Sequence, residues 1–179
     1  MNIQSGDILF VWDIPRYLMD YMDWLTGSPP CHHVATVVDI SGKNWVVEAY
    51  PPKVRKMPLE DYLPELKKWS VNKIHPSRDM RVEIGRCSAF DLKNKELIKE
   101  EVMSWIGKDY SLFKHWFYGK GINCSSLIAL GLLNTELFEQ KDFPAYKFRV
   151  RPIHKIRPID VRLVLYKYHT SFHLVDYNE

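Results

Sequence analysis

The sequence has 179 residues, and a composition of 46% hydrophobic and 13% aromatic residues is typical of a globular chain rather than a disordered one. Its 25 Lys and Arg and 22 Asp and Glu give a net charge of +3, spread along the chain. This charge disfavours a nucleic-acid partner and favours a small peptide or acyl substrate. We expect a single domain covering residues 1–179.

In the first half of the chain, the patterning predicts a strand, a helix and a hairpin. Residues 7–12 have a composition typical of a short strand, and residues 15–25 have apolar positions at helical spacing. Residues 33–40 are rich in β-branched side chains, and a turn cluster follows at 41–44. Residues 45–50 then predict the second strand of the hairpin.

The second half of the chain predicts helices separated by a strand. Residues 58–66 suggest a short helix, and residues 81–87 alternate as a strand does. The next helix is expected to be capped by Asp91 and closed by Gly107. Residues 124–133 are apolar nearly all round, which predicts a buried helix at the centre of the fold.

The chain's ends and cysteines bear on its location and chemistry. The N-terminus lacks the basic and apolar regions of a secretory signal, and no apolar run approaches the roughly 18 residues of a membrane span. We expect a cytoplasmic location without an integral membrane segment, with export by another route left open. Cys31, Cys87 and Cys124 form an odd set without CxxC spacing, which predicts reduced thiols rather than disulfides or a zinc knuckle.

Cys124 stands where a reactive cysteine is expected. Asn123 is a good N-cap residue, so Cys124 falls in the first helical turn, where free N–H groups and the helix dipole favour a thiolate. The same N–H groups can form an oxyanion hole. The alternative is that Cys124 is a small buried apolar residue at the start of a core helix.

A thiolate nucleophile needs a base and a third group that orients the base, and His33 and Glu48 on the hairpin are the candidates. If the loop is centred on Gly42-Lys43, Glu48 lies about 13 Å along the strand from the residue facing His33. If the turn spans residues 39–42, the two side chains are direct cross-strand partners with Cβ atoms about 5 Å apart. A β-bulge would change which face they share. The sequence permits the pair without fixing the register.

His32 competes with His33 for the same role, because only one of two adjacent strand residues faces a given side. Cys31, His32 and His33 could also form a metal site with Cys124. Adjacent strand positions point to opposite faces, and no other ligand spacing supports zinc, so we expect no metal and no cofactor.

A set of short motifs along nearly the whole chain carries a resemblance to a known family. The motifs are Gly6-Asp7-Ile8-Leu9-Phe10, the strand 33–38, Val47-Glu48-Ala49, Gly107-Lys108-Asp109-Tyr110, Ile122-Asn123-Cys124-Ser125-Ser126-Leu127 and Ile156-Arg157-Pro158-Ile159-Asp160. In this order they resemble the circularly permuted NlpC-like cysteine hydrolases, the YiiX-like group of the papain-like superfamily, which are related to lecithin retinol acyltransferase. In that permuted group the histidine strand precedes the cysteine helix, as His33 precedes Cys124 here.

The resemblance implies an α+β, papain-like (permuted NlpC-like) fold, in which an antiparallel sheet packs on a buried helix carrying the cysteine. It implies Cys124 as nucleophile, His33 as general base and Glu48 as the orienting residue, and it matches Tyr110 to a tyrosine near the active site. We expect a cysteine peptidase or amidase that cleaves an amide bond in a cell-wall-type peptide. The alternatives are a lipid acyl hydrolase or acyltransferase with the same site, and a non-catalytic binding module.

Some segments fall outside this resemblance or stay open. The aromatic segment 115–118 does not map onto the family, and Trp116 is a candidate to stack on substrate or to pack in the core or a lid. Basic residues between 147 and 157 predict either a solvated strand face or a positively charged rim for an anionic substrate. Cys31 and Cys87 have no candidate base nearby in sequence and are expected to be structural.

Overall fold

The computed structural model describes residues 2–12, 31–71, 81–110, 121–143, 153–168 and 170–175. The elements in chain order are β1 (Ile8–Trp12), β2 (Cys31–Ile40), β3 (Lys43–Tyr50), β4 (Lys53–Pro58), α2 (Leu59–Val71), β5 (Arg81–Cys87), α3 (Leu92–Ser104), α5 (Cys124–Asn134), the 3-10 turns Gln140–Asp142 and Ile153–Lys155, α6 (Pro158–Lys167) and β6 (Thr170–Leu174). The helix expected at 15–25 and the aromatic segment 115–118 lie outside the described residues.

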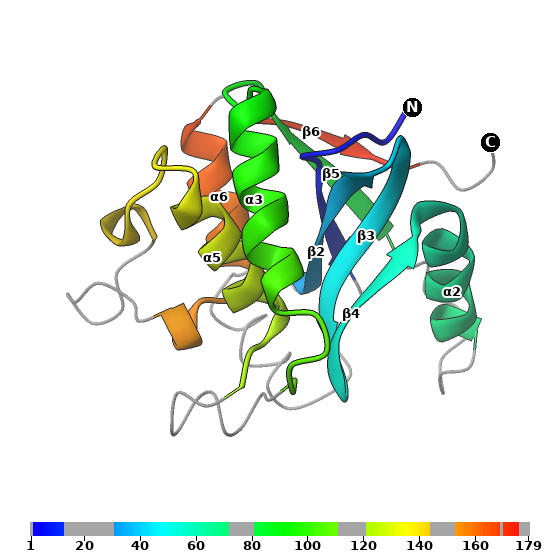
Figure 1. Cartoon of the computed structure of the whole chain (residues 1–179). Helices are drawn as coiled ribbons and strands as arrows, with labels where there is room; N and C mark the ends of the chain where they lie inside the picture. The colour runs from blue at the N-terminus through cyan, green and yellow to red at the C-terminus, as the bar shows by residue number, and fades with distance from the viewer. Residues whose placement is uncertain are drawn as a thin grey trace, which may run out of the picture.

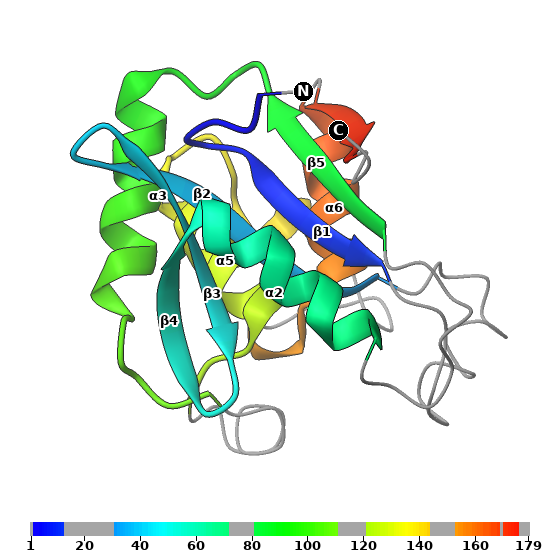
Figure 2. The same ribbon diagram turned by 90° about the vertical axis from the view of Figure 1, so that its right-hand side faces the viewer.

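The strands form one antiparallel six-stranded sheet in the order β4-β3-β2-β1-β5-β6 (Figures 1 and 2). Strand β1 lies inside this sheet, between β2 and β5. Its residues from Ile8 to Val11 are all buried and all apolar, because helices cover the sheet on both faces. The unbroken apolar run is therefore explained by burial of this strand on both faces of the sheet.

The two faces of the sheet carry separate apolar cores. Helices α3, α5 and α6 cover one face, and α2 covers the other (Figure 1). Because side chains alternate along a strand, Val34 packs in the core that contains Leu127 of α5. Its neighbour Ala35 packs in the core that contains Tyr62 and Leu66 of α2. This α+β arrangement of sheet and buried helix is the one expected from the sequence.

Helix α5 begins at Cys124, as predicted, and its first six residues are buried. Asn123 caps it, since its Oδ1 accepts a hydrogen bond of 2.8 Å from the backbone N–H of Ser126. At Gly131 an added Cβ would lie 3.2 Å from Val102 Cγ1 of α3. The glycine therefore lets α3 and α5 approach closely.

The β2–β3 hairpin has a tight two-residue loop. Ile40 pairs with Lys43, and the loop residues Ser41 and Gly42 both have positive φ, at 56° and 78°. This is the pattern of a type I′ turn, whose twist matches that of the strands it joins. Both expected registers, with the loop centred on Gly42-Lys43 or with the turn spanning 39–42, are therefore wrong. Each displaces the cross-strand partner of every β2 residue by two positions.

The helix bounds differ from the expected ones at their C-terminal ends. Helix α2 runs to Val71, beyond the expected 58–66, with Pro64 inside it. Helix α3 begins after Asp91, as predicted, but it ends at Ser104 rather than at Gly107. Gly107 has φ of 81° and donates its N–H to the carbonyl of Val54, at 2.9 Å, so it turns the chain toward β4 instead of closing the helix.

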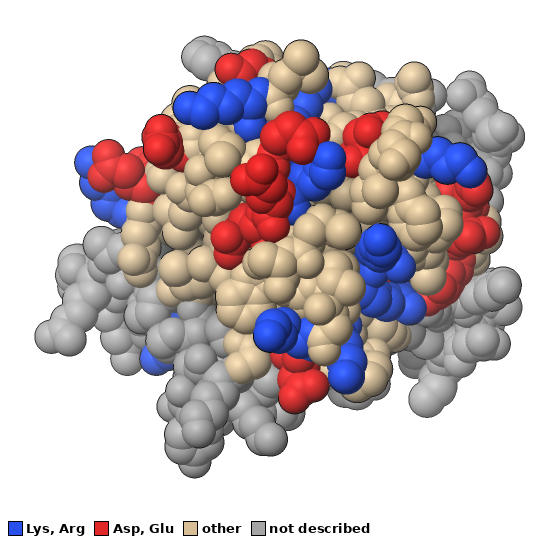
Figure 3. All heavy atoms as spheres, viewed as in Figure 1, with Lys and Arg blue, Asp and Glu red and all other residues tan. Residues whose placement is uncertain are grey.

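The surface of the described residues mixes both signs of charge. Figure 3 shows Lys and Arg interspersed with Asp and Glu across the viewed face. No helix in the described ranges is long and apolar enough to cross a membrane.

Candidate active site

Cys124 lies at the buried N-terminus of α5, beside the first part of β2, and is 7% exposed. Its sulfur accepts hydrogen bonds from the backbone N–H groups of Val34 and Ser125, and it is hydrogen-bonded to the His33 ring. Burial by itself raises the pKa of the Cys124 thiol, but the charge of His33 and these hydrogen bonds outweigh burial and lower it. The surroundings therefore favour the thiolate.

The His33 ring bridges Cys124 and Glu48. Its Nε2 lies 2.6 Å from Oε2 of Glu48, which leaves Nδ1 for the Cys124 sulfur. Burial by itself lowers the pKa of His33, but the Cys124 thiolate and the Glu48 carboxylate raise it to about 10. The arrangement thus favours an imidazolium held between two anions.

The hairpin register explains how Glu48 reaches His33. Continued toward the open end of the hairpin, the pairing of Thr36 with Val47 sets His33 opposite Tyr50. Glu48 is then a diagonal neighbour on the same face, with Cβ atoms about 7–8 Å apart, a gap that the two long side chains span. The rings of His33 and Tyr50 meet edge-on with centroids 6.3 Å apart.

Glu48 is 1% exposed and holds further partners that sequence reasoning missed. Arg55 Nε donates to Oε1 at 2.7 Å, and the Tyr62 hydroxyl donates to Oε2 at 3.1 Å. Burial raises the pKa of Glu48, but His33 and Arg55 outweigh it and lower the pKa. Arg55 lies directly opposite Glu48 in the β3–β4 pairing. A sequence analysis that predicted β4 could therefore have found this pair of opposite charges.

Tyr110, which the resemblance matches to a tyrosine near the active site, lies near enough to Cys124 for the charge of the sulfur to act on its hydroxyl. Its backbone N–H donates to the carbonyl of Pro52 at 2.8 Å, and it forms a β-bridge with Ile122, two residues before Cys124. Burial, followed by the charges of Cys124 and Tyr50, raises the pKa of Tyr110, so its hydroxyl stays protonated. Trp116 lies outside the described residues.

The remaining cysteines differ in their surroundings. A bulge sets Cys31 opposite Trp12 while His33 pairs with Val11, and the Cys31 sulfur lies 3.6 Å from the carbonyl of His33. Burial, followed by the charge of Cys124, raises the pKa of Cys31, so this thiol stays protonated. Cys87 is buried away from this cluster, with its sulfur 3.4 Å from the Tyr168 carbonyl.

The expected competitors and binding features are only partly described. The side chain of His32 lies outside the described part of the chain. In that described part, His, Cys, Asp and Glu form no group of three or more that could hold a metal ion. Of the expected basic rim, residues 147–151 are not described, and Arg157 is paired with Asp160 at 3.3 Å.

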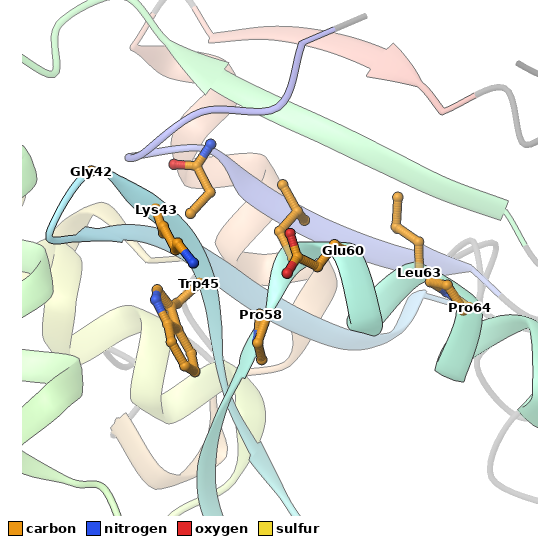
Figure 4. Close-up of a pocket in the computed structure, with 9 residues that line it drawn as sticks. Gly42, Lys43, Trp45, Pro58, Glu60, Leu63 and Pro64 are labelled. Atoms are coloured by element: carbon orange, nitrogen blue, oxygen red, sulfur yellow. The ribbon is translucent and has the colours of Figure 1, made fainter.

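A pocket of about 740 Å³ lies away from the cysteine, between the β2–β3 turn and the start of α2 (Figure 4). Trp45, Pro58 and Leu63 are among its lining residues, and none of its lining residues belongs to the cluster of Cys124, His33 and Glu48. It is therefore separate from the candidate active site.

No protein-family model and no curated protein sequence matches this chain. Among solved structures, the chain is similar to the metalloprotein YiiX from Escherichia coli O157:H7, with a TM-score of 0.53 and 20% sequence identity. The likeness covers 74% of this chain and 66% of the YiiX chain, so this chain spans just under two thirds of YiiX. At this identity the likeness shows a shared fold, which confirms the papain-like α+β fold expected from the sequence motifs.

Proposed function

We propose that this chain is a cysteine hydrolase that cleaves an amide bond, in a cell-wall-type peptide, through an acyl-enzyme on Cys124. One observation carries the proposal: a thiol at a helix N-terminus is hydrogen-bonded to the ring of His33, whose other nitrogen lies 2.6 Å from a buried carboxylate. A nucleophile, a base and an orienting group are linked in this order in triad hydrolases. The sequence motifs and the fold shared with YiiX support the same reading.

In the first half of the proposed reaction, the Cys124 thiolate attacks the carbonyl carbon of the scissile amide. The carbonyl electron pair moves to oxygen, and the backbone N–H of Cys124, in the first turn of α5, stabilises the resulting oxyanion. His33 gives its proton to the leaving nitrogen as the C–N bond breaks, which releases the amine and leaves a thioester on Cys124.

In the second half, water replaces the amine. His33 takes a proton from the water as its oxygen adds to the thioester carbonyl, and the tetrahedral intermediate then expels the Cys124 thiolate. The acid product leaves and the thiolate–imidazolium pair is restored. Glu48 keeps the same ring orientation in both halves, because its Oε2 binds Nε2 while Nδ1 exchanges protons.

The substrate class is tested by comparing amides with esters. Purified chain and its Cys124→Ala variant would be incubated with muropeptides and, separately, with phospholipid vesicles, and the new amines or fatty acids would be measured. Amine release that depends on Cys124 supports the amidase. Fatty-acid release alone would assign the same site to lipid esters. No turnover of either, together with a thiol of ordinary pKa, would favour a binding module.

A further inference from the structure

The Glu48 carboxylate is held by more groups than a simple triad requires. Both of its oxygens accept from side chains on other elements: Oε2 from His33 and from Tyr62 of α2, and Oε1 from Arg55 of β4. Arg55 Nη2 also lies 2.6 Å from Oε1. Donors on both oxygens leave the carboxylate plane little freedom to rotate.

We propose that Arg55 and Tyr62 are positioning residues of the candidate active site, which keep Glu48 ionised and oriented and thereby set the reactivity of Cys124. The proposal rests on the proposed function and names the parts of the fold that support it. Neither residue touches the sulfur through any contact the structure gives. Each acts through Glu48 and then through the His33 ring.

Arg55 is suited to this role by its own anchoring. Its guanidinium binds Glu48 through Nε and Glu65 of α2 through Nη2, at 2.8 Å, and it lies over the Tyr50 ring at 4.5 Å from the centroid. The planar guanidinium can hold two carboxylates at once, which a lysine ammonium cannot do with the same geometry. Arg55 therefore links β4 and α2 to the hairpin that carries His33.

The charges around Glu48 decide whether removing Arg55 raises or lowers the pKa of Cys124. The charged and titratable groups facing it are His33 of β2, Tyr50 of β3, Arg55 of β4, Tyr62 and Glu65 of α2, and, beyond the ring, Cys124 of α5. Without Arg55, burial favours the protonated form of Glu48, and a neutral Glu48 stabilises the imidazolium less. His33 then carries its positive charge less readily, and with less positive charge beside it the Cys124 thiolate is less stable. The pKa of Cys124 therefore rises.

Tyr62 separates orientation from charge. Its hydroxyl donates to the same Oε2 that binds His33, and its side chain is fully buried. Tyr62→Phe removes one donor without changing any charge, so an effect on Cys124 must pass through the orientation and hydrogen bonding of Glu48. We expect this variant to act in the same direction as Arg55→Met, and more weakly.

The fold offers a matched control for Arg55. Arg86 binds Asp7 with Nη2 at 2.7 Å, and the side chains are 29% and 1% exposed, against 30% and 1% for Arg55 and Glu48. Arg86→Met thus breaks a comparable ion pair of the same sheet that has no contact with Cys124, His33 or Glu48. If the reactivity of Cys124 falls only because the fold is less stable, it should fall in both Arg55→Met and Arg86→Met. If it falls because Glu48 is no longer positioned, it should fall only in Arg55→Met.

The experiment measures how fast iodoacetamide alkylates Cys124 in the full chain across pH 4 to 10, with the modified residue identified by mass spectrometry. The quantity compared is the pH at which the alkylation rate reaches half of its maximum. We expect this midpoint to be the same in wild type and in Arg86→Met, and to lie below that of an ordinary cysteine. We expect Arg55→Met to be about one pH unit higher, which is about a tenfold slower reaction on the acid side. The midpoint of Tyr62→Phe should rise by a smaller amount.

Unchanged midpoints in Arg55→Met and Tyr62→Phe, with a low midpoint in wild type, would overturn this inference and leave the proposed function standing. An ordinary midpoint in wild type would instead overturn the proposed function and this inference with it. If Arg55→Met fails to fold, the direction of the Tyr62→Phe shift decides.

Discussion

His33 and Glu48 meet diagonally across the β2–β3 hairpin, with Nε2 of the ring 2.6 Å from Oε2 of the carboxylate. The β2–β3 pairing runs from Ile40 with Lys43 to Thr36 with Val47, and continuing it by three residues would set Tyr50, rather than Glu48, opposite His33. The His33 ring meets the Tyr50 ring at an interplanar angle of 88°, and because Nε2 binds Glu48, Nδ1 is the nitrogen left for the Cys124 sulfur. The hairpin therefore orients the imidazole through one long side chain, and changes at its members have distinct consequences.

Removing the imidazole should leave Cys124 without its counter-charge. In His33→Asn we expect the thiol pKa to rise, because burial then acts without the opposing charge and hydrogen bond of the ring. Turnover should fall on the order of 100-fold or more, the contribution of a positioned acid–base group. Thiolate absorbance at 240 nm, followed across pH, measures the rise in the thiol pKa. An unchanged titration would show that His33 and Cys124 are not coupled.

The pH dependence of wild type should be a broad bell. The pKa of Cys124 is lowered, so the thiolate forms at a lower pH than in a free cysteine, and activity rises there. The pKa of His33 is raised to about 10, so the imidazolium that protonates the leaving amine persists well above neutral pH. We expect kcat/KM to stay high across neutral pH. A descending limb near the ordinary histidine pKa of about 6.5 would contradict the ion pair.

Glu48→Gln keeps the shape of the side chain and removes its charge. The amide cannot accept from His33, Arg55 and Tyr62 with both of its polar atoms, so at least one donor loses its partner. We expect a thiol pKa above that of wild type and a loss of about 3 kcal/mol in unfolding free energy, as for a broken buried ion pair. Urea unfolding measures the loss. Wild-type stability and thiol pKa in this variant would exclude Glu48 from the cluster.

The cap of α5 can be tested against a matched cap elsewhere. Asn123→Ala removes the acceptor for the Ser126 N–H and should lower the free energy of unfolding by about 0.5–2 kcal/mol. It should also loosen the turn that carries Cys124. Asp91→Ala removes an equivalent bond of 2.8 Å to the Asn94 N–H at the start of α3. Both should lower the melting temperature, but only Asn123→Ala should slow alkylation of Cys124. Equal alkylation rates would show that the cap does not position the sulfur.

The sequence predicted those parts of the molecule whose signal is local. The Asn123 cap and the apolar run after it located α5, and the β-branched run located β2. Tertiary contacts decided the rest. Gly85 weakens the strand signal of residues 81–87, yet β5 forms there because the Phe10 and Phe172 rings fill the space over the glycine, 3.0 Å and 3.1 Å from where its Cβ would stand.

The candidate site likewise contains residues that the sequence could identify and residues that depend on tertiary contacts. Cys124 could be singled out from its helix, whereas the partners of Glu48 could not, because Arg55 lies on β4 and Tyr62 on α2, and only the folded sheet and helix bring them to the carboxylate. The hairpin register depended on Ser41 adopting positive φ beside Gly42, which the turn composition allowed without requiring. Helix α6 had a usable signal, Pro158 at its first turn with Asp160 bonded back to the Arg157 N–H at 2.9 Å.

The role of Cys124 as nucleophile is tested most directly by covalent labelling of the intact chain with an acylating active-site probe that has a peptide-like recognition group. We expect one acyl group on Cys124 in wild type, much slower labelling in His33→Asn, and none in Cys124→Ala, whose fold should be intact. Undiminished labelling of Cys124→Ala, or labelling of wild type at Cys31 instead of Cys124, would contradict the assignment of Cys124 as the nucleophile.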